Sequence, residues 1–293
     1  MTRTINFGTK AETLERLRPL VKKSIIGEVY KFTVEQWNKE KEKIINELFG
    51  HFGESVLIVR SSALSEDSLV SSNAGRFCSV LGVRLANKEE FIRVVNKVVF
   101  YYEDTNLAHQ VFVQCLIENV EISGVVFTRD IDTSAPYLIF NYDDFTGSTD
   151  SITSGRSVNS KTLVVYRNRL LFFKDDKFKK ICESVLEIEN LIGYDALDIE
   201  FGYKNGKVHI FQVRPLAGGK KCDAEQEKMI DKTLRQIHSK IQELNSPHPS
   251  LFGKKTLYGI MPDWNPAEMI GIKPRPLSLS FYKELITDNI WAY

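Results

Sequence analysis

Three side chains within residues 198–215 have the chemical types that a magnesium-bound phosphate requires. Glu200 supplies a carboxylate and Gln212 an amide oxygen, and oxygen atoms of this kind ligate Mg²⁺. Arg214 adds a guanidinium fork that matches the geometry of a phosphate. The segment therefore predicts a metal-phosphate site. The alternative interpretation is a half-buried hairpin whose exposed face merely carries polar residues.

The register of this hairpin decides whether the three side chains meet. Apolar and polar residues alternate on both sides of an Asn-Gly dipeptide, which is typical of a tight turn. A two-residue loop would place Ile199 opposite Gln212 and mix apolar with polar side chains on one face. A three-residue loop would place Glu200 opposite Gln212 and keep one face apolar. Because it also pairs Asp198 with Arg214, we expect the three-residue loop.

Two other segments supply positive charge, and a third supplies a glycine-rich loop. Lys10 lies at the expected start of an amphipathic helix, where backbone N–H groups and the helix dipole favour an anion. Arg60 ends the apolar strand 56–60 and is followed by two serines. The loop 145–156 contains two glycines that could let the backbone fold over a ligand. Each feature also has an alternative interpretation without a ligand. Lys10 could be an ordinary first-turn lysine, Arg60 a surface arginine and 145–156 a mobile loop.

Composition and motif content exclude several classes of protein. The chain has 43% hydrophobic and 26% charged residues with a formal net charge of +1, so neither a nucleic-acid nor a membrane partner is expected. The N-terminus lacks an apolar signal region, and apolar runs of about 18 residues are absent, which predicts a cytoplasmic protein. The five histidines lack metal-ligand spacing. The sequence contains neither a Walker motif nor a Rossmann fingerprint.

The mixture of helical and strand patterns predicts an α+β fold. Helical periodicity in 10–23 and 87–107 alternates with several consecutive strands, which favour antiparallel or mixed sheets. Beyond residue 218 a charged helix and a proline-rich segment follow. We therefore expect an N-terminal lobe, a C-terminal lobe and a helical extension, at residues 1–108, 109–218 and 219–293.

Three motifs, in this order, resemble the N-terminal nucleotide-binding domain of the phosphoenolpyruvate synthase and pyruvate phosphate dikinase family. They are VRSSALSEDSLVSSNAGRF (59–77), VFVQCLIENVEISGVVFTRD (111–130) and the hairpin DIEFGY…FQVRP. The similarity spans roughly residues 8–216. It implies an ATP-grasp-like fold that holds ATP between two lobes.

The resemblance also implies roles for individual residues. Three cations would bind the phosphates of ATP, namely Lys10, Arg60 and Arg214. Two oxygen ligands would hold the Mg²⁺ that bridges these phosphates, namely Glu200 and Gln212. Four consecutive residues would form the strand that faces the adenine, namely Gln114, Cys115, Leu116 and Ile117.

The chain departs from this family in two respects. Segment 140–156 lacks the usual glycine-glutamate pairing, which weakens the expectation of phosphate contacts there. The family's phosphorylated histidine lies in a swivelling domain in a glycine-flanked setting, and none of the five histidines here has that setting. We therefore expect a chain that binds ATP, contains no catalytic histidine and depends on a phosphohistidine domain missing from it. Its end within an expected helix at Tyr293 also indicates an incomplete enzyme.

The expected activity is that of an ATP-dependent phosphotransferase of the dikinase type, which converts ATP to AMP and phosphate. The C-terminal segment resembles dikinase-related proteins encoded with capsule biosynthesis enzymes. Among these, L-glutamine kinases start capsular phosphoramidate synthesis by phosphorylating the glutamine amide. The resemblance thus implies a small-molecule acceptor, L-glutamine, with pyruvate as the alternative. A nucleotide-binding module without catalysis and a one-piece, ADP-forming ligase are the other classes left open.

Overall fold

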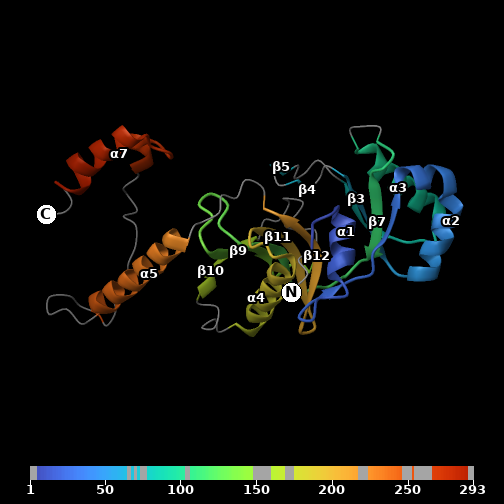
Figure 1. Cartoon of the computed structure of the whole chain (residues 1–293), viewed down its shortest axis with the longest axis horizontal. Coiled ribbons are helices and arrows are strands. Elements are labelled where there is room, and N and C mark those ends of the chain that lie inside the picture. The colour runs from blue at the N-terminus through green and yellow to red at the C-terminus, as the bar shows by residue number, and fades with distance from the viewer. Residues whose placement is uncertain are drawn as a thin grey trace. The chain divides into compact units, whose positions relative to one another are not determined.

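The computed structural model describes residues 5–64, 67–68, 71–72, 78–102, 106–147, 160–168, 175–216, 224–245, 253 and 266–289. The chain divides into two compact units, Met1–Glu227 and Lys228–Tyr293. The described strands all belong to the first unit, while helices make up the second (Figure 1). The expected α+β class with mixed and antiparallel sheets is confirmed.

Sheet A is a six-stranded sheet in the order β1-β12-β11-β8-β9-β10. Its strands are β1 (Ile25–Ile26), β8 (Ile122–Phe127), β9 (Tyr137–Asp143), β10 (Lys161–Tyr166), β11 (Leu197–Lys204) and β12 (Lys207–Pro215). Neighbours are antiparallel except β1 and β12, which are parallel. Helices α1 (Lys10–Leu17) and α4 (Asp176–Ile192) bury their apolar faces in the core of this sheet. The expected helix 10–23 is shorter and ends at Leu17, because Pro19 has no N–H to continue the helical hydrogen bonds.

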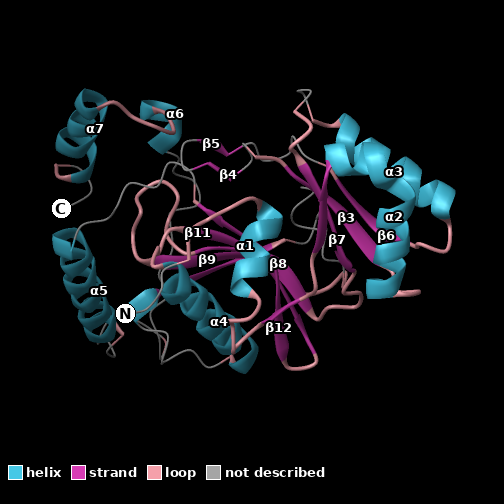
Figure 2. Ribbon diagram, turned by 45° about the vertical axis from the view of Figure 1, so that its right-hand side comes forward, coloured by secondary structure: helices cyan, strands magenta, loops and turns pink. Residues whose placement is uncertain are grey.

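Sheet B is an antiparallel four-stranded sheet in the order β2-β7-β3-β6. Its strands are β2 (Tyr30–Thr33), β7 (Gln110–Cys115), β3 (Leu57–Ser62) and β6 (Ser79–Val83). Helices α2 (Val34–Phe52) and α3 (Lys88–Phe100) form a second apolar core with this sheet (Figure 2). A capping box of Thr33 and Gln36 starts α2. A two-stranded ribbon, β4 (Asp67–Ser68) and β5 (Ser71–Ser72), completes the described strands.

The β11–β12 hairpin has the expected pairing but not the expected loop. Glu200 pairs with Gln212 and Asp198 with Arg214, as the sequence predicts. The loop contains two residues rather than three, because Lys204 pairs with Lys207 and both turn residues have positive φ. The register shifts after Glu200, where a β-bulge changes the pairing by one residue. The bulge, not the loop, brings the polar side chains to one face.

Each sheet combines segments from before and after residue 108. Strand β7 lies after that boundary but pairs in sheet B, and α1 lies before it but packs in the core of sheet A. Phe112 of β7 also belongs to the core of sheet A. Sheet B therefore packs against that core through Phe112. In Figure 1 α1 lies between β12 of sheet A and the strands of sheet B. The proposed division at residue 108 remains a prediction about domains.

The second unit consists of helical segments. Helix α5 (Ala224–Leu244) begins at the end of the first unit, and α6 (Pro266–Ile270) and α7 (Pro276–Tyr282) follow, with a π-helical turn at Lys283–Thr287. None of the described residues in these helices is buried. Among the helices described here, none is both long enough and apolar enough to span a membrane.

Candidate functional site

A buried ion pair lies at the open end of the β11–β12 hairpin. The Nε and Nη2 atoms of Arg214 lie 2.8 and 2.7 Å from Oδ2 of Asp198, which is 6% exposed. Burial raises the pKa of the Asp198 carboxyl, Arg214 lowers it, Glu200 raises it and Lys10 lowers it. Side chains from α1, β11 and β12 are therefore within electrostatic reach of one carboxylate.

Arg60 joins this group from sheet B. Its Nη1 donates to the main-chain oxygen of Phe211 at 3.1 Å and lies 3.5 Å from Oε2 of Glu200. The Arg60 side chain is 11% exposed, and its buried Nε has no hydrogen-bond partner among the described residues. This contact places the end of β3, which carries Arg60, next to the β11–β12 hairpin. A cation from β3 thus lies beside a carboxylate from β11.

The bulge at Phe211 leaves the Phe211 main-chain oxygen available to accept from Arg60. A regular ladder would pair each residue with one partner, but the extra residue of a bulge stays unpaired and can direct its carbonyl elsewhere. The Phe211 ring lies over Gly202, where a Cβ atom would approach the ring carbons to 2.8 Å. Gly202 therefore leaves the space that the bulged residue occupies.

The start of α1 carries Lys10 but has fewer unbonded main-chain N–H groups for an anion than the sequence indicates. Thr9 caps the helix, and its hydroxyl accepts from the Glu12 N–H at 3.4 Å. The Ala11 N–H donates to Oγ of Ser62 on β3 at 3.2 Å. Two of the helix-terminal donors expected to bind an anion therefore already have protein acceptors. The Lys10 side chain, which lowers the pKa of Asp198, is what this helix start adds to the site.

The predicted adenine-facing strand lies at the end of β7. Gln114 is buried and pairs with Ile58 of β3, whereas Cys115 is exposed. The Leu116 N–H donates to the Val56 oxygen at 2.8 Å, so it faces sheet B. Main-chain groups alternate in direction along an antiparallel strand.

This alternation shows which main-chain groups at the end of β7 point away from β3. Those of Cys115 do so, as those of Val113 do toward β2. Strand β2 pairs with β7 only as far as Val113. The Leu116 N–H is bound to Val56, so Cys115 is the β7 residue of the four that could offer main-chain groups to an adenine. The adenine-facing role of the four residues stays a prediction.

Glu200 and Gln212 fit a magnesium ion that is shared with phosphate oxygens. They face each other across the β11–β12 ladder, and Gln212 is 4% exposed. Among the described residues, no group of three or more His, Cys, Asp or Glu is arranged to hold a metal ion. Mg²⁺ commonly takes one or two protein ligands and completes its shell with water and phosphate. Glu200, which lies next to Arg60, and Gln212 opposite it satisfy that requirement.

Asp198 was expected to pair with Arg214, and Ser62 belongs to the serine pair noted after Arg60. Sequence reasoning did not identify Gln110, which connects α1 to sheet B. Alternation along β7 gives its face, but not the helix end that it contacts. The glycine-rich loop expected at 145–156 lies outside the described residues beyond position 147.

No family model matches the chain, and no curated protein does. Among solved structures, D-alanine–D-alanine ligase from Bacillus anthracis is 15% identical with a TM-score of 0.39, covering 80% of this chain and 67% of the ligase. The corresponding ligase from Coxiella burnetii is 15% identical with a TM-score of 0.42, covering 80% and 58%. The VanG D-Ala:D-Ser ligase from Enterococcus faecalis is 15% identical with a TM-score of 0.38, covering 75% and 55%. The chain thus spans about half to two thirds of the length of these ligases.

Proposed function

We propose that the first unit binds ATP with Mg²⁺ where α1, β3 and the β11–β12 hairpin meet. The observation that carries this proposal is the convergence of three cations from separate segments. Arg214 pairs with Asp198 at 2.7 Å, and Arg60 lies 3.5 Å from Glu200. Lys10 lies in the first turn of α1, where the neighbouring Ala11 N–H donates to Ser62 of β3. A triphosphate needs such a set of positive groups together with a carboxylate for its metal ion.

The charges of this region support a ligand that is anionic and contains a metal. Arg60 has a buried N–H without an acceptor among the described residues, which costs about 1–3 kcal/mol until an acceptor arrives. A phosphate oxygen would supply that acceptor. Bound Mg²⁺ would neutralise phosphate charge, while Glu200 and Gln212 would hold the ion from the hairpin side.

We further propose that the unit serves a phosphotransferase of the dikinase type. The motifs around Arg60, Gln114 and Glu200 resemble those of the phosphoenolpyruvate synthase and pyruvate phosphate dikinase family. In such an enzyme ATP yields AMP and phosphate, and a histidine on another domain carries a phosphoryl group to the acceptor. L-glutamine is the acceptor we favour, because the C-terminal segment resembles L-glutamine kinases, and pyruvate is the alternative.

Nucleotide binding is tested by calorimetry of the full chain with Mg²⁺ and a non-hydrolysable ATP analogue. We expect saturable binding that Lys10→Ala weakens by at least about tenfold, since a charged hydrogen bond contributes about 1.5–3 kcal/mol. Lys179→Ala, at a lysine on the exposed side of α4, is the matched control and should bind like the wild type. Absence of binding by the wild-type chain would refute the proposed function.

The reaction type is tested with ATP labelled at the β-phosphate and a dikinase phosphohistidine domain added in trans. Label on the histidine together with AMP supports the dikinase reaction. ADP formation with an amine and a carboxylate would indicate a ligase instead. Binding without any product would leave a nucleotide-binding module and refute the enzymatic part of the proposal.

A further inference from the structure

The first turn of α1 is held by a residue that lies about a hundred positions further along the chain. Gln110, the first residue of β7, is 9% exposed. Its Oε1 accepts from the Thr9 hydroxyl at 2.8 Å, and its Nε2 donates to Oε1 of Glu12 at 3.1 Å. Thr9 and Glu12 are the two members of the α1 capping box. A side chain of sheet B therefore closes the cap of a helix that packs in the core of sheet A.

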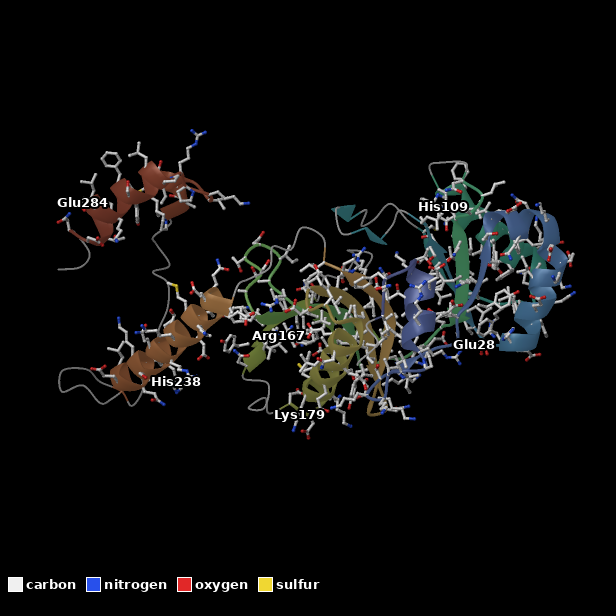
Figure 3. All side chains as sticks on the ribbon, in the orientation of Figure 1. Glu28, His109, Arg167, Lys179, His238 and Glu284 are labelled. Carbon is white, nitrogen blue, oxygen red and sulfur yellow. The ribbon has the colours of Figure 1, made fainter. Side chains whose placement is uncertain are left out.

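Gln110 is itself fixed by the strand that carries Arg60. It pairs with Ser62 in the β3–β7 ladder, and the Ser62 hydroxyl accepts from the Ala11 N–H. The Tyr102 hydroxyl donates to the Gln110 main-chain oxygen and accepts from the Ser62 N–H at 3.1 Å. His109, labelled at this end of sheet B in Figure 3, stacks on Tyr102 with ring centroids 4.6 Å apart. Gln110 is thus held through its side chain by α1 and through its main-chain oxygen by Tyr102.

Lys10 lies between the two anchored positions, Thr9 and Ala11. Its main chain is therefore fixed on both sides by residues of sheet B. Arg60 lies two positions before Ser62, so it projects from the same face of β3. The contacts of Gln110 and Ser62 thus set the position of Lys10 relative to Arg60.

We propose that Gln110 is a positioning residue for the nucleotide, acting through Lys10; this inference rests on the proposed ATP site. An amide is required at this position because it accepts from a hydroxyl and donates to a carboxylate at the same time. A carboxylate there would lose the donor and face Glu12 with a like charge. The helix start would then shift and carry Lys10 away from the phosphates.

The test is a set of variants of the full chain titrated with Mg²⁺ and a non-hydrolysable ATP analogue. Gln110→Glu should weaken binding by about tenfold, because Lys10 moves away and its charged contact with the phosphates is lost. The double variant Gln110→Glu/Glu12→Gln exchanges the two groups and restores a donor facing an acceptor. Its affinity should return to within about threefold of the wild type, a rescue that general loss of stability would not produce.

Coupling to Lys10 is the second readout. In a Lys10→Ala background, Gln110→Glu should change affinity by no more than about twofold, since the group it positions is absent. Thr9→Val, which removes the hydroxyl that Gln110 accepts from, provides a second route if Gln110→Glu does not fold. Thr33→Ala removes the equivalent cap from α2 and should leave affinity unchanged.

The outcomes separate this inference from the proposed function. A wild-type chain that does not bind the analogue overturns both. A wild-type chain that binds, with a full tenfold loss for Gln110→Glu in the Lys10→Ala background or no rescue by the exchanged pair, overturns the role of Gln110 alone. Wild-type affinity in both Gln110→Glu and Thr9→Val has the same consequence.

Discussion

Arg60 donates a hydrogen bond at 3.1 Å to the carbonyl oxygen of Phe211, the residue that the β11–β12 pairing skips. An in-register strand residue would commit its main-chain groups to the ladder, whereas the bulged residue has them free for other partners. The bulge therefore has two effects. It places Glu200 opposite Gln212, and it provides an acceptor that holds an arginine of sheet B against the hairpin of sheet A.

The first prediction concerns the shape of the Arg60 side chain. Arg60→Lys keeps the charge but replaces the planar fork by a single ammonium, so it cannot contact the Phe211 oxygen and a phosphate together. We expect Mg-ATP affinity to fall by about 10–100-fold, which corresponds to about 1.5–3 kcal/mol. Calorimetry measures this, with the exposed Arg84→Lys as control. Equal affinities of Arg60→Lys and the wild type would show that the guanidinium does not contact the nucleotide.

The second prediction concerns the space beneath Phe211. Gly202→Ala would place a Cβ atom 2.8 Å from the Phe211 ring, so the ring or the bulge must move. We expect the free energy of unfolding to fall by about 1–3 kcal/mol, the usual effect of overpacking. Urea denaturation measures it. Gly50→Ala, in α2, adds a methyl group that meets nothing beyond its own stretch of helix, and it should instead stabilise by about 0.5–1 kcal/mol.

The β11–β12 hairpin also shows which of its features the sequence could predict and which it could not. Alternation correctly paired Glu200 with Gln212, but the assumed three-residue loop was wrong. The buried apolar residues of β12 change phase between Ile210 and Val213, and this phase change is the local signature of a bulge. Asn-Gly is typical of a two-residue loop, and the structure has one. To predict it together with the Glu200–Gln212 pairing, the sequence reading had to include the bulge that this phase change indicates.

The contacts of α1 were less accessible from sequence. The spacing of Thr9 and Glu12 is that of a capping box, which is a local pattern. The partner that closes it, Gln110, lies about a hundred residues away, and only the packing of sheet B beside α1 brings it there. Local periodicity fixes which face of a strand is buried, but it does not identify the helix end that contacts this face.

The third prediction is a pH dependence of stability that arises from Glu12. The Gln110 amide is the largest cause that lowers the pKa of the Glu12 carboxyl below 4.5, and the Thr9 N–H lowers it further. Because the pKa is lower in the folded state, the unfolded chain binds more protons below pH 4.5. The Glu12 contribution to stability is therefore present above that pH and is lost as the pH falls through the folded-state pKa.

Urea denaturation between about pH 3 and pH 6 checks this prediction. Glu12→Gln keeps a capping amide but cannot ionise, so the loss of stability at acid pH should be smaller than in the wild type. Other acidic groups titrate in both proteins and cancel in the difference. Identical slopes for the two proteins would mean that the contact between Gln110 and Glu12 does not favour the ionised carboxyl.

The fourth prediction separates the metal role of Glu200 from its ion pair with Arg60. Glu200→Gln keeps the size of the side chain but removes the negative charge that attracts Mg²⁺ and faces the Arg60 guanidinium at 3.5 Å. If Glu200 holds the ion, the Mg²⁺ concentration needed for half-maximal ATP binding should rise by about tenfold, since charge is the main attraction for a hard cation. ATP binding measured without Mg²⁺ should be unchanged or stronger, because a carboxylate that repels phosphate has gone. Equal losses with and without the metal would instead assign Glu200 to the folding of the hairpin.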